Sequence, residues 1–117
     1  MSLTVQTARR GDLAVVSVAG ELDMATAPQL EEEIAALLAR GESRLVLDLA
    51  EVSFCDSTGL SVFVRTRNRC QDAGGRLRIA AAPRAVRRVL EVSGLVDVLE
   101  VCPTVDAAVA ADRPAFG

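Results

Sequence analysis

The side chains best suited to chemistry in this sequence lie in one short segment, Asp56-Ser57-Thr58-Gly59, where a carboxylate precedes two neighbouring hydroxyls. A hydroxyl becomes a nucleophile only when a general base of suitable pKa takes its proton. The chain has no His, and its 13 cationic residues are all Arg. Asp56 would have to act alone, and an ordinary aspartate is too weak a base for a serine. We therefore expect no catalytic residue.

The residue types that are missing exclude most enzyme classes. Without His there is no Ser-His triad and no imidazole metal ligand, and without Lys there is no Walker-type phosphate loop or Schiff base. The cysteines, Cys55, Cys70 and Cys102, lie far apart with no C-x-x-C spacing. An odd, scattered set argues against a disulfide framework and against a zinc site. We expect reduced, mostly buried cysteines, no metal and no cofactor.

Length and charge narrow the possible partners. The chain has 117 residues, of which 50% are hydrophobic, enough for the core of one domain. Its net charge of −3 disfavours a nucleic-acid partner, because domains that bind nucleic acid usually carry a basic surface. No uncharged stretch approaches the roughly 18–20 residues that span a bilayer, and residues 1–10 lack the apolar core of a secretory signal. We therefore expect a cytoplasmic protein that binds neither nucleic acid nor a membrane.

The elements that must position the Asp56 segment follow from the apolar periodicity. Residues 3, 5 and 7 alternate with polar side chains, and residues 13–19 form a second extended, mostly apolar run after the turn Arg10-Gly11-Asp12, which predicts a β-hairpin that Gly20 ends. The later strands are expected at residues 45–49, 77–80 and 98–101, and the helices at residues 26–41, 57–74, 83–93 and 104–112.

Strands that alternate with helices of this length indicate an α/β fold. We predict a single domain with a mixed sheet of four or five strands, an N-terminal antiparallel hairpin and about four helices, packed mainly on one face of the sheet. The domain is expected to cover residues 1–112, and residues 113–117 are expected to form a C-terminal tail.

Two loops should meet at one edge of this sheet, because sites in open α/β sheets gather beyond the carboxyl ends of parallel strands. They are residues 20–26, with Glu21 and Asp23, and residues 53–60. Asp56 or Ser57 would cap the helix that follows, and Thr26, or Asp23 in its place, would cap the earlier one. Gly59 costs about 0.5–1 kcal/mol in a first helical turn, so we interpret it as room for the close approach of a partner.

The loop motifs resemble those of a known family. They are Gly20-Glu21-Leu22-Asp23, Asp56-Ser57-Thr58-Gly59-Leu60, Gly74-Gly75 and Ser93-Gly94-Leu95. Together, and over essentially the whole chain, they are similar to the anti-sigma factor antagonists, the bacterial members of the STAS domain family. Either of the first two motifs alone would be a weak signal.

The resemblance implies a partner-switching regulator. Such an antagonist binds an anti-sigma factor and so frees a sigma factor, and the anti-sigma factor is usually also a serine kinase that uses ATP. The implied phosphorylation site is Ser57, with Thr58 as the alternative, and a serine phosphatase removes the mark. The partner-binding residues implied by the family are Glu21, Asp23, Asp56, Ser57, Thr58 and Gly59.

Other readings of the sequence stay open at this point. The chain could be a STAS scaffold or interaction subunit that is never phosphorylated, or, less in keeping with its residues, a nucleotide-hydrolysing protein. We expect a monomer, with a weak dimer as the alternative. The arginines of the second and third helices are interpreted as a solvated face, with contact to an acidic partner as the other reading.

Overall fold

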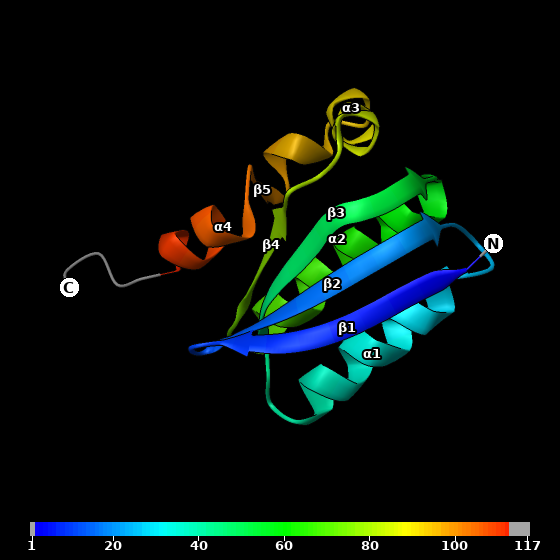
Figure 1. Ribbon diagram of the computed structural model, residues 1–117. Coiled ribbons are helices and arrows are strands. Elements are labelled where there is room, and N and C mark those ends of the chain that lie inside the picture. The colour runs from blue at the N-terminus through cyan, green and yellow to red at the C-terminus, as the bar shows by residue number, and fades with distance from the viewer. Residues whose placement is uncertain (1, 113–117) are drawn as a thin grey trace.

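Five strands form one sheet in the order β1-β2-β3-β4-β5, so each strand lies beside its neighbour in sequence. In this computed structural model, which describes residues 2–112, β1 runs antiparallel to β2 and all the other pairs are parallel (Figure 1). The elements in chain order are β1 (Leu3–Arg10), β2 (Leu13–Leu22), α1 (Ala27–Ala39), β3 (Arg44–Cys55), α2 (Ser57–Asp72), β4 (Arg76–Ala80), α3 (Arg84–Val92), the short 3-10 helix η1 (Leu95–Asp97), β5 (Glu100–Cys102) and α4 (Val105–Ala111). The predicted α/β class and the hairpin are confirmed. The expected tail at residues 113–117 lies outside the described residues.

Alternation along the strands sends side chains to two unequal cores. Val16, Leu47 and Ile79 belong to the larger core, which packs against α1, α2 and α3. Val15 and Val46 point to the opposite face, where they pack with Ala108 and other residues of α4. Three helices on one face and one on the other agree with the expectation that most helices share a face.

Strands β2 and β3 are longer than predicted, which moves Glu21 from a loop into a strand. Gly20 does not end β2, although its φ of +111° lies in the region that favours glycine. Ser17 of β2 pairs with Asp48 of β3, and the next pair is Ala19 with Glu51, so β3 contains one residue more than β2 between these pairs. A second irregularity follows Gly20. These bulges in β3 absorb extra residues and let the pairing continue, which periodicity alone did not reveal.

The entry to α1 also differs from the prediction. Thr26 occupies the N-cap position but its side chain does not cap the helix, because its hydroxyl donates to the Glu21 carbonyl at 2.7 Å. Asp23, the predicted alternative, does not cap α1 either, because its side chain bonds to residues that precede the helix. Its Oδ1 accepts from the N–H groups of Ala25 at 2.9 Å and Thr26 at 3.1 Å. These hydrogen bonds between residues 21 and 26 stabilise the turn between β2 and α1.

An ion network centred on one buried arginine, at the amino-terminal edge of the parallel strands, holds α4 against the sheet. Arg78 of β4 has only 3% of its surface exposed, and its guanidinium donates to Glu100 at 3.0 Å and to Asp112 at 2.9 Å. The same group donates to the Ala111 carbonyl at 3.3 Å, and Arg44 forms a second ion pair with Asp112. All five donor positions of a guanidinium are fixed in one plane, which suits such a multidentate role.

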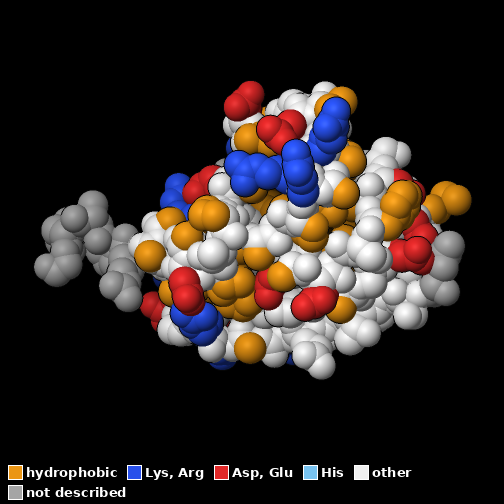
Figure 2. Space-filling view, turned by 45° about the horizontal axis from the view of Figure 1, so that its top comes forward, with side chains coloured by type: hydrophobic (Ala, Val, Ile, Leu, Met, Phe, Trp, Pro, Cys, Tyr) orange, Lys and Arg blue, Asp and Glu red, His pale blue; other side chains and the backbone are white. Residues whose placement is uncertain are grey.

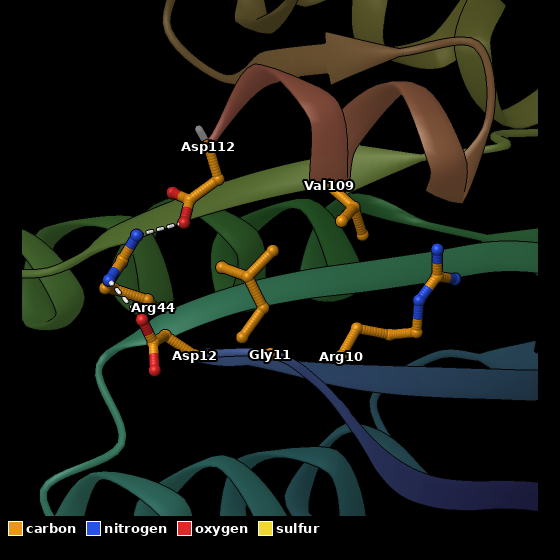
Figure 3. A pocket seen from close by; sticks show the side chains of 7 residues that line it. Arg10, Gly11, Asp12, Arg44, Val109 and Asp112 are labelled. Atoms are coloured by element: carbon orange, nitrogen blue, oxygen red, sulfur yellow. Dashed lines mark hydrogen bonds and ion pairs between the residues drawn. The ribbon is translucent and has the colours of Figure 1, made fainter. Parts of the chain in front are cut away.

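A pocket of about 410 Å³ lies beside this network, between the β1–β2 turn and α4 (Figure 3). Figure 3 shows Arg44 lying between Asp12 and Asp112, with the nearer nitrogen 3.8 Å from the Asp12 carboxylate. Arg10, the other cation of the pocket, pairs with Asp106 at 3.0 Å. The arginines of this pocket are therefore neutralised by neighbouring carboxylates.

The role of Arg78 can be tested against a neighbour on the same strand. Replacement Arg78→Ala should lower the free energy of unfolding by about 3 kcal/mol, because it leaves the Asp112 carboxylate buried with one partner fewer. Arg76 also pairs with Glu100, at 3.1 Å, but its side chain is 54% exposed. Arg76→Ala should therefore cost at most about 1 kcal/mol. Urea denaturation measures both, and equal losses would contradict the proposed anchoring.

Candidate functional site

The two loop motifs meet where β2 and β3 end. Leu22 lies opposite Cys55 in the parallel register, and Glu21 lies opposite Phe54. The Asp56 N–H donates to the Leu22 carbonyl at 3.2 Å, which joins the last residue of β2 to the residue before α2. The expectation that these segments border each other at one edge of the sheet is confirmed. In Figure 1 this edge lies at the right, where β3 turns into α2.

Asp56 caps α2 and leaves the neighbouring serine free. Its backbone is extended, and its Oδ1 accepts from the N–H groups of Thr58 at 2.9 Å and Gly59 at 3.2 Å. Such a carboxylate satisfies two of the donors that a helix start leaves without partners. Of the two candidate caps, the structure thus uses Asp56.

Ser57 is the first residue of α2 and is exposed. Within the described part of the chain, its hydroxyl takes part in none of the hydrogen bonds, although its carbonyl accepts from the Ser61 hydroxyl at 3.0 Å. Thr58 is half-buried. The structure therefore presents Ser57 more openly than the alternative acceptor.

Three acidic residues lie at the ends of the two strands that meet beside Ser57, at the end of β2 and directly after β2 and β3. Glu21, Asp23 and Asp56 are all half-buried. Asp23 and Asp56 already accept backbone hydrogen bonds, which fixes their positions. The surface beside Ser57 therefore combines a neutral hydroxyl with fixed negative charge.

Gly59 is required by packing inside the domain, which corrects the interpretation that it leaves room for a partner. It is buried, and an added Cβ would lie 2.6 Å from the Cys55 sulfur and 3.0 Å from the Leu22 side chain. Burial, and then the nearby charge of Asp56, raise the pKa of the Cys55 thiol to about 11. Cys55 is therefore a protonated packing residue at neutral pH, as its place at the end of a strand predicts.

Two exposed apolar side chains beside the acids were missed by sequence reasoning. Met24 is 77% exposed and Phe54 is 50% exposed. Strict alternation from the buried Val52 would place Phe54 in the core, but the irregular register at the end of β3 turns it outward. Figure 2 shows orange and red side chains gathered at this end of the molecule. The only sequence signal for this exposed surface was Phe54, a large apolar residue in a segment that was predicted to be a loop.

Two further findings concern the whole described part of the chain. Within residues 2–112, no group of three His, Cys, Asp or Glu side chains is arranged to hold a metal ion. None of the helices in the described residues has the length and apolar character needed to cross a membrane.

Comparison with known proteins places this geometry in context. The sequence profile of the STAS domain family matches residues 4–108. An anti-sigma-B factor antagonist of Staphylococcus epidermidis is 35% identical over 101 residues, which cover 86% of this chain and 94% of that protein. The crystal structure of an anti-sigma factor antagonist from Mycobacterium paratuberculosis is 36% identical, covers 97% of this chain and 96% of its own, and superposes with a TM-score of 0.89. Unphosphorylated SpoIIAA, an anti-sigma factor antagonist, shares the fold at 22% identity, 97% coverage of this chain, 100% of its own and a TM-score of 0.81.

The packing role of Gly59 predicts a non-additive pair of mutations. Gly59→Ala should lower the free energy of unfolding by about 1–3 kcal/mol, because the new methyl group overlaps the Cys55 sulfur. In the background of Cys55→Ala, where that sulfur is absent, the same replacement should cost clearly less. Chemical denaturation of the two single variants and the double variant tests this. Equal costs in both backgrounds would show that the glycine is not held by this contact.

Proposed function

Since this chain belongs to the anti-sigma factor antagonists of the STAS domain family, we propose that it is a partner switch controlled by phosphorylation of Ser57. The unphosphorylated chain binds an anti-sigma factor, and the sigma factor held by that protein is released. The anti-sigma factor acts as the serine kinase, and a serine phosphatase restores the binding form. This exchange would take place in the cytoplasm, where sigma factors meet RNA polymerase.

The observation that carries the proposal is the free, exposed hydroxyl of Ser57 beside the cap of α2. In the transfer, Ser57 Oγ would bond to the γ-phosphorus of ATP as the bond to the leaving ADP breaks, and a base of the kinase would take the hydroxyl proton. Asp56 is committed to two backbone N–H groups, so its proposed part is to hold the acceptor in place. The chain is thus a substrate of the kinase.

Phosphorylation at this position should change the surface without unfolding the domain. A helix N-terminus favours negative charge, so the start of α2 tolerates a phosphate. The phosphate nevertheless adds about −1.5 to −2 charges next to Glu21, Asp23 and Asp56. A partner surface that fits a neutral hydroxyl would then meet repulsion and lose solvation. A cost of about 4 kcal/mol at one such contact is enough for a thousand-fold loss of affinity.

Replacement of the acceptor tests the switch. Ser57→Ala should keep the fold, bind the anti-sigma factor, and continue to bind when ATP is added, because the hydroxyl that receives the phosphoryl group is absent. Thr58→Ala is the matched control and should still be phosphorylated at Ser57. Ser57→Asp should bind more weakly than wild type, with a smaller loss than phosphorylation causes, since one carboxylate carries less charge than a phosphate.

The measurement is binding of each purified variant to the purified anti-sigma factor with and without ATP, followed by mass spectrometry of the modified peptide. If the Ser57→Ala variant is still fully phosphorylated, Thr58 and not Ser57 is the residue that accepts the phosphoryl group. A wild-type chain that binds the anti-sigma factor and is never phosphorylated would support the passive scaffold instead.

A second pair of variants separates the cap from the charge of Asp56. Asp56→Asn keeps an oxygen that accepts from the Thr58 and Gly59 N–H groups, so stability should stay within about 0.5 kcal/mol of wild type, whereas Asp56→Ala should lose about 0.5–2 kcal/mol. If the carboxylate itself is recognised, both variants should be phosphorylated at least about tenfold more slowly at Ser57. Normal phosphorylation of Asp56→Asn would limit Asp56 to its role as a cap.

A further inference from the structure

Helix α3 carries a group of arginines that the fold itself does not use. Arg84, Arg87 and Arg88 are exposed, and none forms an ion pair with another described residue. Most other arginines of residues 2–112 do pair with carboxylates, namely Arg9, Arg10, Arg40, Arg44, Arg65, Arg76 and Arg78. Figure 2 shows blue side chains gathered over α3, with red side chains beside them. We call these three residues the α3 arginines.

Their arrangement is unfavourable for the helix. Arg84 is the first residue of α3, whose first turn holds no acidic residue, so a cation lies at the positive end of the helix dipole. Arg84 and Arg88 are four residues apart and place like charges on the same face. Glu91 is the only acid of α3. Helix stability therefore does not explain the α3 arginines, and such local conflicts are typical of functional surfaces.

A shallow apolar groove lies between α2 and η1, the short helix that follows α3. Its volume is about 370 Å³, and its lining is Leu60, Ser61, Val64 and Arg65 of α2 together with Leu95 of η1. Ser61 lies one helical turn after Ser57 and donates to its carbonyl. Leu95 follows α3 after Ser93 and Gly94. A protein seated at Ser57 can thus continue across apolar surface toward α3.

We infer that the anti-sigma factor bound at Ser57 extends over this groove and places acidic side chains against the α3 arginines. This inference rests on the proposed function and names the charge of the partner surface. A protein suits the whole surface better than a nucleic acid, because the end with Glu21 and Asp23 would repel phosphates. Charges opposed in this way speed association and fix the orientation of the complex.

The test compares two double charge reversals of equal size. Arg87→Glu/Arg88→Glu alters the α3 arginines, and Arg67→Glu/Arg69→Glu alters two arginines of α2 that also lack an ion pair within the described residues. At about 50 mM NaCl, the α3 variant should bind the purified anti-sigma factor about tenfold more weakly, mainly through slower association. The α2 variant should stay within about twofold of wild type. At about 500 mM NaCl, screening should bring the α3 variant within about twofold of wild type as well.

Several outcomes would overturn the inference. Circular dichroism confirms that the variants are folded, and Arg87→Gln/Arg88→Gln, which removes charge without reversing it, should show a smaller loss of the same kind. If wild type binds and is switched by Ser57 phosphorylation while the two reversals bind alike, this inference fails and the proposed function stands. A wild type that binds no anti-sigma factor overturns both. Binding of a labelled DNA duplex that Arg87→Glu/Arg88→Glu abolishes would assign the α3 arginines to nucleic acid instead.

Discussion

The surface around Ser57 depends on one interaction. At the start of α2, the Asp56 carboxylate accepts two backbone hydrogen bonds. A helix must satisfy its first N–H groups, and Asp or Ser serves equally well as the cap. Because Asp56 does so, Ser57 becomes the first helical residue and its hydroxyl is left to solvent. Had the serine been the cap, its oxygen would point back into the helix start and would be engaged there. The choice of cap thus determines which side chain a partner can reach.

The cap is held in place by the strands beneath it. The bulges of β3 let it stay paired with β2 as far as Leu22 and Cys55, and the Asp56 N–H extends this pairing by one more bond. Gly59 then packs directly onto the Cys55 and Leu22 side chains, so α2 leaves the sheet at a fixed angle. The same irregularity turns Phe54 outward beside the acids. Strand register, helix start and exposed surface are therefore set together.

Periodicity was sufficient for the fold class and for the meeting of the two loops, because both follow from element order and from the handedness of parallel connections. It failed where a local contact overrides a pattern. Gly20 reads as a strand end but accommodates a bulge, and Gly59 reads as an open site but fills a tight one. Nothing in the sequence marked Arg78 as a buried cation, yet it is buried and bonded to Asp112, which lies far along the chain. Such pairings between distant residues leave no periodic signal. The proposed role of Ser57 came from the resemblance to a family, since the spacing alone is satisfied by a helix cap.

Phosphate at Ser57 and the charge of α3 would act on different properties of the same complex. The phosphate adds charge of about −2 at one point, where Glu21, Asp23 and Asp56 already make the surface negative. Its repulsion falls off within about 10 Å at moderate salt, so it acts on the groups packed against Ser57. The α3 arginines keep their charge in both states, because the phosphate is added at Ser57 and not to them. Under the proposed function, the α3 arginines select and orient an acidic partner at all times, whereas the state of Ser57 decides whether that partner remains bound. Selection and switching can then be altered separately, since they rest on different helices.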